Sequence, residues 1–419
     1  MIIRKLVNNK INNLIEYSLL FVLIVFAFIM PISADLGRKV LTVAFIILIP
    51  ILDYKKIYTI IKNNTYIKYI TIFILFCILS MLWTEDYDEG KRIIRTILRY
   101  WYIPTIVLIS IINKENIKYV IAAFLSGMII NHLISYAIYF FKIKTIFSFQ
   151  LVGTELNPVV FQASHMEYSV YLAFTSLILF YYSLKYEYYK FKIPLFVLSL
   201  SMITVLFLLF GRTGQVSFII TSTILILIYF KKNIKLIILS FLGLIGIFYI
   251  AYNNGITFKD RVNQAIIELK QVTNSTYNTS IGVRLSAYRI IPEIIDSTNI
   301  FIGVGIGDSR NITYEINKKL YDNAFDVQKG KLHESFLTIF HALGIVGLFL
   351  FTYSLYYLCR LKGKDKDVNF IKYAFIPLII VSIMTNEFMG QKEILLLLAL
   401  FPSIFISDDI NDDYNINKV

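Results

Sequence analysis

A charged side chain interrupts two apolar stretches near the middle of the chain, in the motif Gly211-Arg212-Thr213-Gly214. A permanently charged guanidinium at a membrane boundary is costly unless it has a partner or reaches water. Arg212 is therefore a candidate functional residue. The alternative is a short turn whose arginine extends to the lipid headgroups.

A histidine stands where a long polar segment gives way to the next apolar run, in Leu332-His333-Glu334. A neutral imidazole at this junction can act as a general base near neutral pH. The alternative for His333 is a structural role. Three other histidines lie within or near apolar runs, where we expect packing or hydrogen bonding: His132, His165 and His341.

A second arginine falls in the polar segment, on a helix predicted over residues 283–291, where Pro292 perturbs the helix. Arg284 and Tyr288 are one turn apart and share a face of this helix, whereas Arg289 points elsewhere.

An earlier part of the same segment, residues 258–272, has the pattern of an amphipathic helix. Its apolar face holds Val262, Ile266 and Leu269. Two interpretations stay open, a helix lying on the membrane surface and an ordinary loop helix.

Glycines recur in the sequence GVGIG at residues 303–307. This pattern is superficially like a dinucleotide-binding loop, but no strand and helix flank it as that loop requires. A tight turn permitted by glycine is the prediction. Gly344 and Gly347 form a second small-residue pattern, which predicts close approach of a neighbouring helix.

Membrane helices must position these residues. Hydrophobic residues make up 57% of the 419 residues, well above the roughly 45–50% of soluble domains. The apolar runs that could span a bilayer are residues 16–33, 39–53, 66–83, 98–112, 117–141, 163–183, 193–210, 215–230, 234–252, 334–358, 372–387 and 393–407. We therefore predict an all-α polytopic membrane protein with about 12 transmembrane helices.

This pattern divides the chain into four parts. Residues 1–252 hold the first nine helices, 253–332 a large helical outer loop, 333–407 the last three helices and 408–419 a tail. The loop is too long for a simple connection, so we expect a helical subdomain that carries function.

Charge placement orients the chain. The formal net charge is +13, but the basic residues cluster between apolar runs, which argues against nucleic-acid binding. If both termini are cytoplasmic, the short inner connections hold about twice as many lysines and arginines as the short outer ones. The run Tyr100-Trp101-Tyr102 would then form part of an aromatic belt at the outer surface. Glu167 and Glu387 would lie near the outer ends of spans, where either could pair with an arginine.

Cysteine usage supplies no further site. Cys77 and Cys359 are the two cysteines, too few for a disulfide framework. No cluster of histidines and carboxylates has metal-ligand spacing, so we predict neither a metal nor a cofactor.

The ordered set of motifs resembles the O-antigen ligase family. It comprises residues 211–214 between two spans, Arg284-x-x-x-Tyr288 leading to residues 303–307, and residues 333–337 leading to 344–347. The resemblance covers roughly residues 160–405 by motif and the whole chain by topology. It implies an inverting C-type glycosyltransferase in the bacterial inner membrane. Such an enzyme moves a glycan from undecaprenyl diphosphate to a lipid A-core sugar at the periplasmic face.

The resemblance also implies roles for individual residues. Arg212 and Arg284 would bind the diphosphate and His333 would be the base, with no metal required. Tyr288 and Arg289 are possible supporting residues. Glutamate follows the histidine here, where asparagine or serine is frequent in relatives, so Glu334 could raise the basicity of His333 or take the proton itself.

Two other functions fit parts of the pattern. An O-antigen or capsule polymerase would use the same lipid-linked donor but lengthen the glycan on its carrier. A lipid-oligosaccharide flippase would need charged residues along a central cavity, yet the spans 193–210 and 234–252 carry none. The expected partners of a ligase are the donor, the acceptor and membrane lipids.

Overall fold

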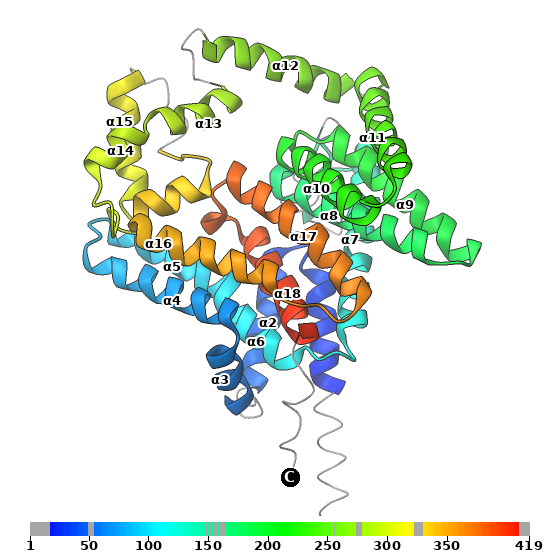
Figure 1. Ribbon diagram of the computed structural model, residues 1–419, viewed down its shortest axis with the longest axis horizontal. Helices are drawn as coiled ribbons and strands as arrows, with labels where there is room; N and C mark the ends of the chain where they lie inside the picture. The colour runs from blue at the N-terminus through cyan, green and yellow to red at the C-terminus, as the bar shows by residue number, and fades with distance from the viewer. Residues whose placement is uncertain are drawn as a thin grey trace, which may run out of the picture.

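The computed structural model describes residues 17–48, 54–146, 149–150, 153–154, 157–159, 164–254, 256–273, 279–321 and 330–409. Its regular structure there is helical, apart from one small antiparallel hairpin of β1 (Thr145–Ile146) and β2 (Phe149–Gln150). Within these ranges, eight helices are long and apolar enough to cross a membrane. The predicted all-α polytopic class is confirmed (Figure 1).

The eight long apolar helices coincide with predicted spans. They are α4 with η1 (Thr65–Leu79 and Ser80–Leu82), α5 with η2 and α6 (Tyr87–Ile97, Leu98–Tyr102 and Ile103–Ile111), α7 (Ile117–Phe141), α9 (Tyr189–Leu208), α10 (Arg212–Phe230), α11 (Ile234–Asn254), α16 (Ser335–Arg360) and α17 (Lys366–Thr385). The other predicted spans fall on helices that are shorter, less apolar or charged at their ends. These are the helix Tyr17–Ile29, α2 (Ala34–Leu48), α8 (His165–Lys185) and α18 (Lys392–Asp409). The helix α3 (Tyr54–Asn63) connects α2 to α4.

The prediction of an aromatic belt at residues 100–102 was wrong. The helix begins at Tyr87, well before the predicted start of the span, so this run lies in the middle of a continuous helix. Tyr100 and Trp101 are buried, Trp101 with only 1% of its surface exposed. The rings that pack around Trp101 are Phe73, Phe351 and Phe388.

Segments predicted on one side of the membrane contact one another. On the predicted outer side, Lys392 forms an ion pair with Asp35 at 3.0 Å. On the predicted inner side, the Ser407 hydroxyl donates to the Ile112 carbonyl. The loop helices lie at the top of Figure 1 and α3 at the bottom.

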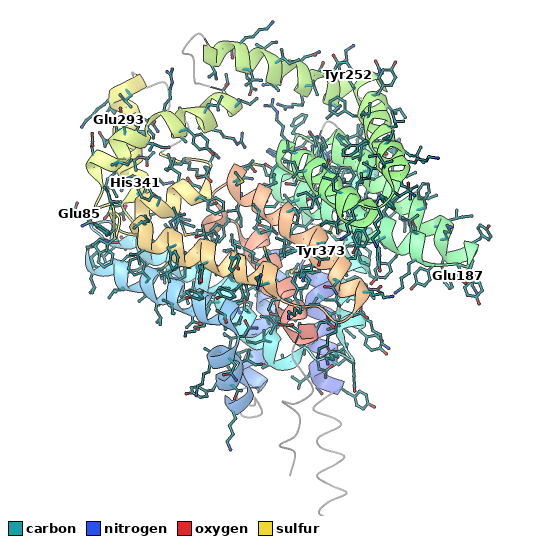
Figure 2. All side chains as sticks on the ribbon, viewed as in Figure 1. Glu85, Glu187, Tyr252, Glu293, His341 and Tyr373 are labelled. Atoms are coloured by element: carbon teal, nitrogen blue, oxygen red, sulfur yellow. The ribbon has the colours of Figure 1, made fainter. Side chains whose placement is uncertain are left out.

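The long loop is built from α12 (Ile256–Thr273), α13 (Ser280–Arg289), α14 (Ile291–Ser297) and α15 (Ser309–Tyr321). Both helices predicted in this segment are present, as α12 and α13. In Figure 2, Tyr252 at the end of α11 and Glu293 on α14 lie on opposite sides of the view, with α12 and α13 between them. Residues of α13, α14 and the segment around His333 share a small second core: Ala287, Ile290, Ile294, Leu332 and Leu337.

The helix α16 is kinked at Gly344, where φ is +64°. The loop backbone before α15 runs along this kink. Val304 and Gly305 donate their N–H groups to the carbonyls of His341 and Ala342, at 3.0 and 2.9 Å. These bonds satisfy carbonyls in the region of the kink.

Glycine is required on both sides of this contact. A Cβ on Gly344 would lie 2.3 Å from the carbonyl carbon of Phe301, and a Cβ on Gly303 would lie 2.4 Å from that of Ala342. Gly303 and Gly305 also have positive φ, so the predicted tight turn is confirmed. The prediction for Gly344 was wrong in one respect, because its open side admits a loop backbone instead of a neighbouring helix.

Candidate functional site

Arg212 begins α10 and is held at the site by close packing of its motif against α8. The Gly214 N–H donates to the Ser169 hydroxyl at 3.0 Å, and a Cβ on Gly214 would lie 2.3 Å from the Ser169 backbone. The Arg212 guanidinium forms a two-pronged ion pair with Glu268 of α12, at 3.0 and 3.2 Å. Of the two interpretations of this arginine, the one in which it has a partner is therefore observed.

Glu268 connects Arg212 to α13, the helix that carries Arg284. Its carboxylate is 3% exposed and also accepts the Ile281 N–H at 3.0 Å, in the first turn of α13. A buried carboxylate needs such partners. It occupies two of the five N–H donors that the Arg212 guanidinium carries.

Arg284 projects from α13 toward the end of α17. Its Nε donates to the Thr385 carbonyl at 3.2 Å. Burial lowers the pKa of Arg284, and the charge of Arg212 lowers it further. Tyr288 lies one turn further along α13, where burial and then the charge of Glu334 raise the pKa of its phenol. The predicted shared face of Arg284 and Tyr288 is confirmed.

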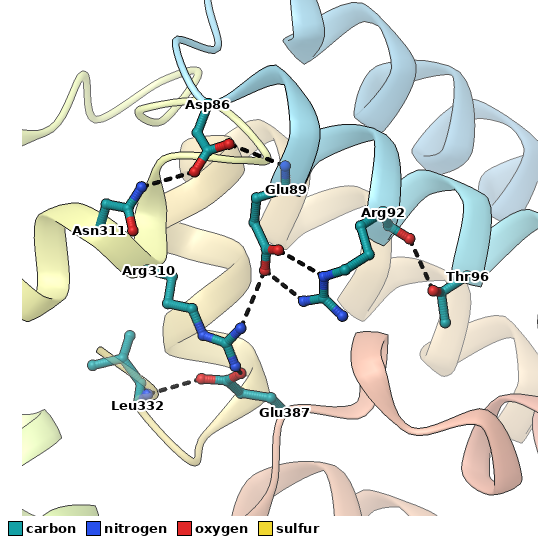
Figure 3. Close-up of polar contacts among 8 residues, drawn as sticks. All are labelled: Asp86, Glu89, Arg92, Thr96, Arg310, Asn311, Leu332 and Glu387. Atoms are coloured by element: carbon teal, nitrogen blue, oxygen red, sulfur yellow. Dashed lines mark hydrogen bonds and ion pairs between the residues drawn. The ribbon is translucent and has the colours of Figure 1, made fainter. Parts of the chain in front are cut away.

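His333 has the left-handed backbone conformation, with φ of +52°. Such a conformation costs a non-glycine residue about 1–3 kcal/mol and persists only where its surroundings enforce it. Glu387 provides the restraint: its carboxylate accepts the N–H groups of Leu332, at 2.8 Å, and of His333. Arg310 lies 3.9 Å from Glu387 and 3.2 Å from Glu89, as Figure 3 shows. The predicted pairing of Glu387 with an arginine is thus confirmed, with Arg310 as partner.

The His333 imidazole is neutral at physiological pH. Burial lowers its pKa to about 4, with further lowering by the charges of Arg284, Lys331 and Arg310. The ring therefore keeps a lone pair that can accept a proton. Arg284 is thus within electrostatic range of the imidazole.

Glu334 caps α16. Its carboxylate oxygens accept the N–H groups of Phe336, at 3.1 Å, and of Leu337. Burial raises the pKa of this carboxyl, while the two backbone donors oppose that effect. Its hydrogen bonds stabilise the helix that starts immediately after His333.

A short segment between α17 and α18, residues 385–388, joins the three parts of the site. Asn386 donates its side-chain amide to the Thr213 hydroxyl at 3.1 Å, next to Arg212. The Ser335 hydroxyl donates to the Asn386 carbonyl and accepts the Phe388 N–H at 3.0 Å. With Thr385 bound to Arg284 and Glu387 to the His333 turn, this segment fixes the relative positions of all three. Sequence reasoning missed it, apart from Glu387.

Further cations surround the site that were not among the predicted residues. The Arg261 guanidinium lies 3.9 Å from the centre of the Phe210 ring, and burial and the charge of Arg212 lower its pKa. The charge of Lys331 lowers the pKa of His333. The sequence positions of Arg261 and Lys331 could have identified both as site residues. Arg261 lies on the polar face of the predicted amphipathic helix, and Lys331 is two residues from His333. Arg289 is exposed, as is Lys331.

The arrangement is suited to a polyanionic ligand beside a group that loses a proton. Three guanidiniums, those of Arg212, Arg261 and Arg284, interact with the single carboxylate of Glu268, so this part of the site has an excess of positive charge. Guanidinium forks match the oxygens of phosphates. The neutral imidazole next to them can take a proton from a hydroxyl.

A comparison with known families gives a match over the central part of the chain. The family model described as O-antigen ligase matches residues 197–352. This range contains Arg212, Arg284, His333 and the contact between Gly303 and Gly344. No curated protein matches the chain.

Proposed function

Since this match assigns the chain to the O-antigen ligase family, we propose that the protein transfers a glycan from undecaprenyl diphosphate to a lipid A-core sugar. Transfer takes place at the periplasmic face of the bacterial inner membrane, with both termini in the cytoplasm. The observation that carries this proposal is the assembly of two arginines and a neutral imidazole around residues 385–388.

The arginines bind and stabilise the leaving group. Arg284 and the donors of Arg212 that Glu268 does not occupy bind the phosphate oxygens of the donor. Their charge offsets the negative charge that develops as the bond between the anomeric carbon and the phosphate oxygen breaks. Because guanidiniums supply this charge, the reaction proceeds without a metal and persists in a chelator such as EDTA.

His333 activates the acceptor. Its imidazole takes the proton of the attacking hydroxyl, whose oxygen forms the new bond to the anomeric carbon. Attack from the face opposite the diphosphate inverts the configuration. Glu334 acts as a positioning residue, because its oxygens hold the start of α16. The proton then leaves His333 for water as undecaprenyl diphosphate is released.

Reconstitution tests the proposal. Purified protein in proteoliposomes receives a defined undecaprenyl diphosphate glycan and a lipid A-core acceptor, and the glycosylated acceptor is quantified. We expect His333→Ala to lower the rate by about 10²–10⁴-fold and Arg284→Ala or Arg212→Ala by about 10²–10³-fold. Arg95→Ala, an exposed arginine on α5, is the matched control and should retain the wild-type rate.

The product distinguishes ligase from polymerase. Glycan attached to the lipid A-core acceptor supports the ligase. Longer glycan on the lipid carrier, with the core unmodified, would show that the protein is a polymerase. Near-normal transfer by His333→Ala would contradict the assignment of the base.

A further inference from the structure

A polar pocket lies outside the set of residues described above, on the same predicted outer side. It has a volume of about 250 Å³. Its walls come from three places in the chain: the turn before α2, the start of α8 and the start of α18. The lining residues that matter here are Asp35, Glu167, Gly390, Lys392 and Glu393, which we call the carboxylate pocket.

Glu167 gives the pocket an unsatisfied acceptor. The residue is 7% exposed, and its Oε2 has no hydrogen-bond partner among the residues that the structure describes. A buried carboxylate oxygen without a donor costs free energy, which a ligand with hydroxyl donors would recover. The pocket is also far larger than the space that one water needs.

Lysines offset the negative charge around the pocket. Lys392 forms an ion pair with Asp35 at 3.0 Å, and Lys331 lies close enough to Glu167 to interact with its charge. The binding of a free cation in this pocket would therefore be only weakly favourable. A neutral molecule with several hydroxyl groups fits better, because it can donate to Glu167 and accept from Lys392.

Two connections link the carboxylate pocket to His333. Lys331 interacts electrostatically with both Glu167 and His333. The wall at Gly390 follows Glu387 closely in the chain, and Glu387 holds the turn at His333. A sugar ring seated in the pocket would thus lie near the proposed base.

We propose that the carboxylate pocket binds a neutral, hydroxyl-bearing sugar ring of the acceptor, through hydrogen bonds from its hydroxyls to Glu167. This assignment rests on the proposed function and adds the place and chemistry of acceptor binding. The donor diphosphate occupies the arginine cluster formed by Arg212 and Arg284, and the acceptor binds in the carboxylate pocket.

Gly390 offers a way to fill the pocket. A Cβ at this position meets no atom within 4 Å, so Gly390→Phe adds a ring at the wall of the pocket without a backbone clash. Glu167→Gln keeps the shape of the side chain and removes its charge. Gly243→Phe is the matched control, because Gly243 on α11 is equally open and lies far from the pocket lining.

The test uses the full chain in proteoliposomes, with KM measured separately for the undecaprenyl diphosphate glycan and for the lipid A-core acceptor. We expect Gly390→Phe and Glu167→Gln each to raise the acceptor KM about tenfold or more, with the donor KM unchanged. Calorimetry with the free core oligosaccharide should show binding to wild type and to Gly243→Phe, and weakened binding to both pocket variants.

Three results would overturn the inference. These are an unchanged acceptor KM in both pocket variants, a rise in the donor KM instead, and an equal loss in Gly243→Phe. Each would leave the proposed function intact, provided that wild-type protein transfers glycan. Absence of transfer by wild type, with the donor bound, would instead refute the proposed function.

Discussion

The pH dependence of transfer gives the sharpest test of the proposed base. Burial and three neighbouring cations lower the pKa of His333 from 6.5 to about 4. This difference corresponds to about 3.4 kcal/mol between the two protonation states. The profile of kcat/KM for the donor reports the free enzyme, so its acid limb should lie near pH 4. The profile of kcat reports the complex, whose acid limb should lie at higher pH, because the bound diphosphate offsets the charges of Arg284, Lys331 and Arg310.

A single substitution separates the electrostatic part of this effect from burial. Lys331→Gln removes one cation beside the imidazole, so the acid limb of kcat/KM should move to higher pH than in wild type. Histidine NMR of labelled protein gives the pKa directly, with His333→Gln identifying the resonance. An acid limb near pH 6.5 in the free enzyme, or a limb that Lys331→Gln leaves in place, would refute the reasoning.

Other predictions follow from single contacts. Glu268→Ala leaves a half-buried guanidinium and a backbone N–H without their partner, and should destabilise the protein by about 3 kcal/mol in thermal unfolding; an unchanged Tm would contradict this. Gly344→Ala must adopt a φ of +64° with its Cβ 2.3 Å from Phe301, so we expect a loss of more than about 3 kcal/mol or no folded protein; a stable variant would show that the kink relaxes. Glu387→Gln weakens the restraint on His333 and should lower kcat about tenfold with the donor KM unchanged, whereas a change in KM alone would argue against a positioning role.

Hydropathy predicted most of the fold because the bilayer imposes a simple rule on backbone hydrogen bonding. The apolar runs therefore coincide with helices, and the loop helices α12 and α13 appear where their patterns place them. The error at Tyr100 to Tyr102 has a physical reason. An amphipathic helix, α5, continues directly into an apolar one, and its charged residues hide the true helix start from a hydropathy reading.

The site was only partly predictable. Arg212, Arg284 and His333 stand out because each is an ionisable residue at a membrane boundary or next to a motif. Residues 385–388 do not stand out, since they act largely through backbone carbonyls, N–H groups and small polar side chains. Such contacts depend on how the helix ends meet and leave no periodic pattern in the sequence.

The charges of the site contribute to the low pKa of its proposed base, His333. With the donor absent, burial together with the charges of Arg284, Lys331 and Arg310 holds the pKa of His333 low, so the imidazole is a poor base for any hydroxyl, including that of water. A bound diphosphate brings negative charge to the same cations and raises the basicity of the ring. The strength of the base is then coupled to occupancy of the arginine cluster, and proton removal from the acceptor is favoured only when a donor is in place. This coupling predicts that a donor analogue lacking the glycan raises the His333 pKa as much as the donor does, because the diphosphate alone carries the charge.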